Sequence, residues 1–181
     1  MNRSYRRFHQ TITVSRETLK ELVDLARLSA TGGNVQPLKF ILSCEPKKND
    51  LIFPHLKWAG YLKDWAPEEG EKPAAYIIVL GDKRIKQSFG CDHGIAAQSI
   101  LLGATEKNLG GCIVGTIQKP ALSKALEIPE HFEILLVLAL GKPKETVVIE
   151  PVGPDGDIKY WRDAKSVHHV PKRSLDELII E

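Results

Sequence analysis

Three arginines and a serine crowd the first seven residues, which read Arg3, Ser4, Tyr5, Arg6 and Arg7 from the third position onward. Guanidiniums and a hydroxyl at this spacing can surround a phosphate, because arginine donates paired, charge-assisted hydrogen bonds to an oxyanion. The run therefore predicts a phosphate site. A solvated tail is the alternative, since charged chain termini are often disordered.

A second polar run, residues 31–37, reads Thr-Gly-Gly-Asn-Val-Gln-Pro. Its glycines allow the backbone to approach a flat ligand, and Asn34 and Gln36 carry amide donors and acceptors suited to the edge of a heteroaromatic ring. Pro37 favours an extended backbone at Gln36. The run predicts a site for a planar ligand, with an ordinary polar turn as the alternative.

A third run lies near the end of the chain, where Lys172 and Arg173 precede Ser174. Ser174 and Glu177 have the spacing of a capping box, which predicts a short helix after them. The amino end of a helix beside two cations is a good anion site. By composition alone, this run and the first could also form a basic surface for nucleic acid.

Other catalytic patterns are missing. The sequence has no phosphate-binding P-loop, no hydrolase nucleophile motif, no zinc-protease motif and no dinucleotide fingerprint. Cys91, Asp92 and His93 are adjacent, and neighbours on a helix do not face one point, which favours structural roles over a metal or thiol site. We expect no metal site, and no catalytic acid or base stands out.

Composition narrows the class of protein. The chain has 181 residues, 43% hydrophobic and 27% charged, with a net charge of +2. These values are typical of a folded globular protein and give no general support for binding to nucleic acid or a membrane. Three cysteines without paired spacing and no apolar run of about 18 residues predict a cytoplasmic protein.

The elements that must position these runs follow from hydrophobic spacing. Apolar periodicity predicts helices at 15–30, 92–109 and 120–126, and β-branched apolar runs predict strands at 38–43, 75–80, 112–117 and 133–140. Their alternation indicates a layered α/β or α+β core without a dividing linker. The helix at 92–109 has almost no polar face and many small residues, so we expect another helix or a second subunit against it.

Several segments are assigned to loops. A polar loop and an irregular aromatic stretch follow the first strand, and the acidic run of Glu68, Glu69 and Glu71 is expected to be solvated. Residues 154–157 are expected to form a hairpin turn. Glycines at 32–33 and 110–111 are expected to end the first two long helices.

Taken together and in order, the runs resemble the nitroreductase family of FMN-dependent oxidoreductases. The family begins with an R-R-S-x-R-x-F-like motif, continues to S-x-x-N-x-Q-P, and later has a D-x-G-x-A-x-Q helix that ends in G-L-G. This sequence matches the last pattern with Asp92, Gly94, Ala96, Gln98 and residues 109–111. The resemblance covers nearly the whole chain, which it marks as a single FMN-binding domain over residues 1–181.

The resemblance implies a dimeric three-layer α/β/α sandwich, in which a mixed central sheet is flanked by helices. The FMN phosphate would lie against Arg3, Ser4, Arg6, Lys172 and Arg173, and the isoalloxazine against the backbone of Ile113, Val114 and Gly115. Thr31, Asn34 and Gln36 would reach the flavin from the other subunit. Asn2 stands where the family has its first arginine, and Thr31 stands where it has a serine.

The activity implied is electron transfer from NADH or NADPH through FMN to a small nitroaromatic, quinone or similar acceptor. The flavin does this chemistry, and the protein supplies position and electrostatics. A protein that stores or senses FMN without turnover would share every binding motif and is the main alternative. The implied partners are a small-molecule acceptor and a second copy of the chain.

Overall fold

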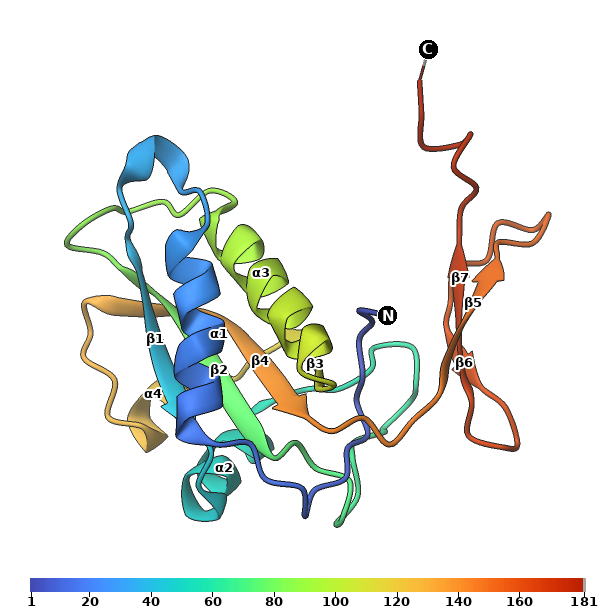
Figure 1. The fold of residues 1–181 in the computed structure, drawn as a ribbon, viewed down its shortest axis with the longest axis horizontal. Coiled ribbons are helices and arrows are strands. Elements are labelled where there is room, and N and C mark those ends of the chain that lie inside the picture. Colours follow the sequence, from blue (N-terminus) through green and yellow to red (C-terminus); the bar gives the residue numbers. More distant parts are fainter. Residues whose placement is uncertain (181) are drawn as a thin grey trace.

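Long apolar runs become the strands of a four-stranded sheet in the computed structural model, which describes residues 1–180 (Figure 1). The last residue of the expected 1–181 domain lies outside the described residues. The elements of the body are α1 (Arg16–Leu28), β1 (Leu38–Ser43), α2 (Pro46–Ile52), β2 (Ala75–Asp82), α3 (Asp92–Glu106), β3 (Gly110–Val114), α4 (Lys119–Ala125) and β4 (Phe132–Gly141).

The strand order of this sheet is β1-β2-β4-β3, and each neighbouring pair is antiparallel. A parallel bridge between Ser4 and Gly111 adds the start of the chain to the β3 edge, which makes the sheet mixed. β1 has the predicted bounds. β3 begins at Gly110, so the two glycines expected to end α3 belong to the strand instead.

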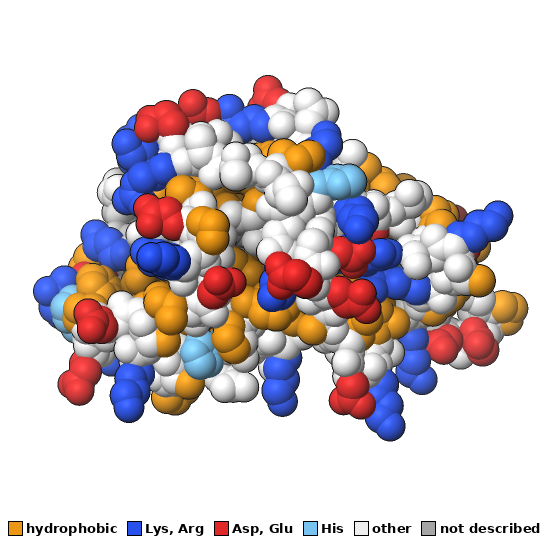
Figure 2. All heavy atoms as spheres, turned by 90° about the horizontal axis from the view of Figure 1, so that it is seen from below, with side chains coloured by type: hydrophobic (Ala, Val, Ile, Leu, Met, Phe, Trp, Pro, Cys, Tyr) orange, Lys and Arg blue, Asp and Glu red, His pale blue; other side chains and the backbone are white. Residues whose placement is uncertain are grey.

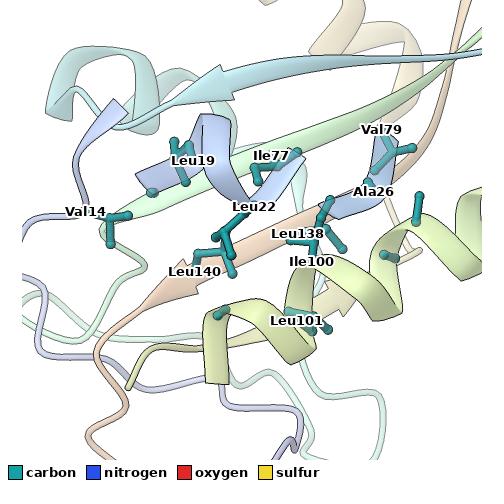
Figure 3. Close-up of a cluster of buried hydrophobic side chains, with 14 of the residues drawn as sticks. Val14, Leu19, Leu22, Ala26, Ile77, Val79, Ile100, Leu101, Leu138 and Leu140 are labelled. Atoms are coloured by element: carbon teal, nitrogen blue, oxygen red, sulfur yellow. The ribbon is translucent and has the colours of Figure 1, made fainter. Parts of the chain in front are cut away.

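One face of the sheet is covered by α1 and α3, as the close-up in Figure 3 shows. Leu22 of α1, Ile100 of α3 and Leu138 of β4 are fully buried between these layers. A Cβ atom at Gly103 would lie 2.2 Å from Leu25 Cδ1, so a larger residue there would displace the Leu25 side chain between α1 and α3. The close partner expected for α3 is therefore α1 within the same chain, although Ile95 and Leu102 remain exposed.

The opposite face is covered by α2, α4 and a 3-10 turn at Phe53–His55. The prediction of a polar loop after β1 is wrong, because Pro46 begins a helix that buries Ile52 completely. β2 is buried along its whole length as a result. The body is the three-layer α/β/α arrangement that the resemblance implied.

Both long helices end earlier than their glycines predicted. The hydroxyl of Ser15 accepts from the Thr18 backbone N–H at 3.0 Å and starts α1 as expected. α1 ends at Leu28, and α3 ends before Asn108, which adopts a left-handed φ of 57°.

No helix in the described part of the chain is long and apolar enough to cross a bilayer.

Residues 143–180, here called the arm, carry a second sheet beside the body (Figure 1). It contains β5 (Val147–Pro151), β6 (Trp161–Arg162) and β7 (His168–Lys172), in the order β5-β7-β6. A turn forms at 154–157, where the Gly156 N–H donates to the Gly153 carbonyl at 2.9 Å. The prediction that this turn closes a hairpin is wrong, because β5 and β6 pair on opposite sides of β7. The capping bonds between Ser174 and Glu177 form at 3.0 and 3.3 Å, but they close a turn and not a helix.

His169 joins the strands of the arm. Its Nδ1 lies 2.7 Å from Glu150 Oε1, and its Nε2 lies 3.5 Å from Asp163 Oδ2. The ring of Trp161 stacks on the imidazole at 5.0 Å between centroids. The hydrogen bond to Glu150, helped by Asp163, raises the pKa of His169 above its usual value.

This raised pKa predicts that the arm loses stability at alkaline pH. The protonated imidazole is favoured in the folded arm, so its contribution is complete below the unfolded pKa of about 6.5 and is lost as pH rises through the higher folded pKa. Hydrogen exchange, corrected for intrinsic rates, should show weaker protection of β6 and β7 amides at pH 8.5 than at pH 6. His169→Gln should remove this difference, and an undiminished pH effect in that variant would contradict the assignment.

Candidate functional site

The N-terminal segment, residues 3–8, runs along the outer edge of β3. The Tyr5 N–H donates to the Gly111 carbonyl at 2.9 Å, and Phe8 is completely buried. A Cβ atom at Gly110 would lie 2.5 Å from the Tyr5 ring, so glycine is required for the segment to lie this close. The alternative of a solvated tail is therefore wrong.

Arg7 is fully neutralised within the protein. Its Nε and Nη2 each donate to the Glu71 carboxylate at 2.6 Å, and Lys144 Nζ lies 2.9 Å from the same group. The Arg7 hydrogen bonds lower the pKa of Glu71 to about 2. Glu71 was expected in a solvated acidic loop, but it is 9% exposed, because it supplies the charge that Arg7 needs when partly buried.

Arg3 and Arg6 have no such partner. Arg6 Nη1 lies 3.2 Å from His168 Nε2 and 3.5 Å from the Ser4 carbonyl oxygen, and its guanidinium lies over the Tyr160 ring at 4.9 Å. Arg3 Nε is buried without a hydrogen-bond partner. No ion pair involves either arginine in the described residues, so two cations beside β3 lack a counter-charge.

A buried carboxylate holds this segment in place. Glu145 accepts hydrogen bonds from the backbone N–H groups of Arg6 and Arg7 and from Arg162 Nη2, the last at 2.8 Å. Its side chain is 0% exposed. The guanidinium of Arg162 also lies 3.9 Å from the Trp65 ring centroid. One carboxylate thus links the start of the chain, the arm and the aromatic stretch.

The edge of β3 is open next to these cations. The backbone of Gly111 pairs with the N-terminal segment, and the Lys57 N–H donates to the Thr116 carbonyl at 3.0 Å. Between these two contacts, no other described backbone group pairs with the outer edge of residues 112–115. The open edge borders a cavity of about 150 Å³ that Arg6 and Tyr160 also line.

The cavity is lined by Ile113, Val114 and Gly115, the residues expected to lie against the isoalloxazine. Ile113 is 38% exposed, so this edge is accessible to a ligand. Burial raises the pKa of the neighbouring Cys112 thiol, which therefore stays protonated at neutral pH. The three cysteines are free, and the described residues contain no His, Cys, Asp and Glu cluster able to hold a metal.

The other wall of this cavity is formed by the aromatic stretch, residues 56–66, to which the family resemblance assigned no role. The ring of Tyr61 packs on Tyr160 at 4.9 Å, and Trp58 lines both this cavity and an adjoining one of about 530 Å³. These contacts join residues 99 positions apart in the chain. The sequence predicted only an irregular stretch here and could not identify Tyr160 as its partner.

Loop 31–36 lies at the other end of α3. The Gly32 N–H donates to Asp92 Oδ1 at the start of that helix, whereas Tyr5 contacts Gly111 just beyond its end. Fifteen helical residues span about 22 Å, so the two runs do not meet along α3 in one chain. Thr31 is partly buried, and Asn34 and Gln36 are exposed.

The backbone at Gln36 is not extended as Pro37 predicted. Its φ is 54°, in the left-handed region, and Asn34 has a φ of 55°. Two hydrogen bonds accompany this conformation: the Gln36 N–H donates to the Thr31 hydroxyl at 3.3 Å, and its side-chain amide donates to the Asn34 carbonyl at 3.2 Å. Local bonding therefore outweighs the preference imposed by the following proline.

Lys172 and Arg173 stand at the end of β7, where both are exposed. The Lys172 carbonyl accepts from the Val152 N–H at 3.0 Å. Within residues 1–180, no hydrogen bond or ion pair joins this pair to Arg3, Ser4 or Arg6. His168, four residues before Lys172, is the arm residue that reaches Arg6.

Basic and acidic side chains interleave over the face shown in Figure 2. A nucleic-acid surface would need a continuous basic stripe with aromatic residues among the cations. The distribution on this face therefore gives no support to that alternative.

A sequence model of the nitroreductase family matches residues 2–142, which include the N-terminal segment, loop 31–36 and β3. The chain belongs to the nitroreductase family. The match ends one residue before the arm begins, so the family pattern covers the body and the arm lies outside it.

Solved structures share the fold. A nitroreductase family protein from Clostridium novyi NT is 22% identical, with 79% of this chain and 82% of that chain covered at a TM-score of 0.64. An FMN-dependent nitroreductase from Clostridium difficile R20291 is 20% identical, and the match covers 79% of this chain and 84% of that chain at a TM-score of 0.65. The NADPH:FMN oxidoreductase from Vibrio harveyi, complexed with NAD+, is 20% identical, and the match covers 85% of this chain and 71% of that chain at a TM-score of 0.65.

The Glu145 junction predicts a large and specific stability effect. Glu145→Ala leaves the partly buried Arg162, whose side chain is 13% exposed, without its counter-charge, so the free energy of unfolding should fall by about 3 to 5 kcal/mol. Glu133→Ala is the matched control, because its 3.4 Å pair with Lys119 is about half exposed. This control substitution should lower the free energy of unfolding by at most about 1 kcal/mol. Urea denaturation at one protein concentration measures both, and equal losses would contradict the role given to Glu145.

Proposed function

We propose that this nitroreductase-family chain is an FMN-dependent oxidoreductase that passes electrons from NADH or NADPH to a small nitroaromatic, quinone or similar acceptor. The observation that carries the proposal is the pair of unneutralised arginines, Arg3 and Arg6, beside the open edge of β3. Two cations without carboxylate partners need an anion, and an open strand edge offers backbone groups to a planar ring. A phosphate joined to a flat heteroaromatic ring meets both requirements.

The residues present fit such a group. Arg3, Ser4 and Arg6 would bind the phosphate, and the backbone of Ile113, Val114 and Gly115 would lie against the ring system. Lys172 and Arg173 would add charge if the end of the arm closes over the phosphate. We place the protein in the cytoplasm, in keeping with its three free cysteines.

A second copy of the chain completes the site in this proposal. The cavity of about 150 Å³ beside β3 is by itself smaller than the roughly 300 to 1,000 Å³ of typical ligand sites, so a flavin would extend beyond it. Thr31, Asn34 and Gln36 of the second copy would supply the missing polar contacts. The exposed Ile95 and Leu102 on α3 provide apolar surface for such a contact.

The division of labour follows from the side chains. FMN, when bound, supplies the redox chemistry. The chain binds and orients it through the two arginines and the β3 edge, and the aromatic stretch limits water on one side of the cavity. The protonated Cys112 thiol takes no part as a nucleophile, and we assign no catalytic acid or base.

A purified protein should show flavin absorbance that bleaches when NADH or NADPH is added without oxygen. Electron transfer from the nicotinamide removes the absorbance of the oxidised flavin, and an added nitroaromatic or quinone should restore it. Anaerobic spectrophotometry makes the test. Flavin bands that persist would favour storage or sensing of FMN, and a colourless protein that cannot be reconstituted with FMN would refute the proposal.

Substitutions of the arginines in the N-terminal segment should affect the binding of FMN selectively. Arg6→Gln should weaken FMN binding by about 10- to 100-fold, since bonds to charged groups contribute about 1.5 to 3 kcal/mol. Riboflavin lacks the phosphate and should bind Arg6→Gln and wild type almost equally. Arg7→Gln is the matched control, because Arg7 is already paired with Glu71.

Fluorescence titration of both flavins into the apoproteins measures these affinities. Arg7→Gln should lower stability but preserve the ratio of FMN to riboflavin affinity. The same fall in that ratio for both variants would show that general destabilisation, and not contact with phosphate, explains the effect of Arg6.

A further inference from the structure

Two side chains of the arm hold the guanidinium of Arg6. Nη1 lies 3.2 Å from Nε2 of His168, and the guanidinium carbon lies 4.9 Å from the centre of the Tyr160 ring. The same tyrosine ring packs against His168, with 5.1 Å between centroids. The three side chains form one cluster, in which the arm sets the direction of an arginine from the start of the chain.

The contact fixes the protonation state of His168. A guanidinium only donates hydrogen bonds, so Nε2 must accept, and the single proton of the neutral ring lies on Nδ1. Burial keeps the pKa of His168 well below its usual value, and the nearby Arg6 acts in the same direction. The imidazole is therefore a neutral acceptor at pH 7.

This arrangement costs stability. His168 is 0% exposed, and its Nδ1 has no partner among the described residues. A buried N–H without an acceptor loses the hydrogen bond that water would provide. Proteins keep such local violations mainly at functional sites, where another requirement outweighs stability.

Two members of the cluster lie outside the region that the family model matches. The family match ends at residue 142, and both Tyr160 and His168 follow it. Arg6, in contrast, lies in the matched region and lines the cavity at the β3 edge. The cluster thus joins two arm residues to an arginine that lines the cavity of the body.

We propose that His168 is a positioning residue for the phosphate site. Its Nε2 holds the Arg6 guanidinium in the direction of the FMN phosphate, while Tyr160 packs against the guanidinium face. The inference rests on the proposed function, because it needs a phosphate beside Arg6. The expectation from the sequence was different: Lys172 and Arg173 were the residues near the end of the chain expected to bind the FMN phosphate.

The adjacent His169 provides a matched control. Successive side chains of a strand point in opposite directions. His169 contacts Glu150, Asp163 and Trp161 within the arm, and it makes no hydrogen bond to Arg6. It stabilises the arm without reaching the cavity.

The test compares His168→Leu, His168→Gln and His169→Gln by titrating FMN and riboflavin into each apoprotein. His168→Leu should lower the ratio of FMN to riboflavin affinity by about 3- to 10-fold, the range expected for one hydrogen bond. Its thermal midpoint should stay unchanged or rise, because the unpaired N–H is gone. His168→Gln should restore the ratio, since its amide oxygen can accept from Arg6.

His169→Gln should lower the thermal midpoint and leave the ratio unchanged. An unchanged ratio in His168→Leu, or an equal loss of FMN and riboflavin binding, would overturn the positioning role. A ratio that falls equally in His169→Gln would also overturn it, because loss of arm structure would then explain the effect. A wild-type protein that binds FMN no better than riboflavin would overturn the phosphate site itself, and the inference with it.

Discussion

The arrangement of the site depends on the hydrogen bonds that the buried carboxylate of Glu145 accepts. A charge with no exposed surface must be compensated inside the protein. Arg162 of the arm and the backbone N–H groups of Arg6 and Arg7 meet that requirement together. Glu145 and Arg162 both belong to the arm, so the backbone N–H groups of Arg6 and Arg7 are what tie this carboxylate to the start of the chain. Separating the arm from the start of the chain would remove these hydrogen bonds from a buried charge. The position of Arg6 beside the β3 edge therefore depends on one buried carboxylate.

The core of the fold could be predicted from local sequence because its signals are local. β1 and β2 follow from short apolar runs, and Ser15 caps α1 as its type and position indicated. Helix ends were less predictable. Asn108 ends α3 two residues before the glycine that was expected to do so, since a left-handed asparagine serves equally well. α2 was missed because its early residues are polar and only Ile52 is buried.

The site was only partly predictable, because charge pairing is not local. The three arginines of the N-terminal segment look alike in the sequence, but Arg7 is neutralised by a residue 64 positions away, whereas Arg6 meets one 162 positions away. Nothing in the spacing distinguishes them. Glu71 was assigned to solvent for the same reason. Residue type predicted that an anion site would form, and only tertiary contacts show which cations remain available for it.

The open edge of β3 also limits what can bind there. Unpaired strand edges attract other strands and are a common route to aggregation. Here the exposed stretch is confined to residues 112–115, with the N-terminal segment at one end and residue 57 at the other. Strands usually contain about 5 to 6 residues, so a foreign polypeptide would collide with one of these flanks before its pairing was complete. The flanks therefore leave at most four residues of β3 open to pairing, fewer than an average strand would need.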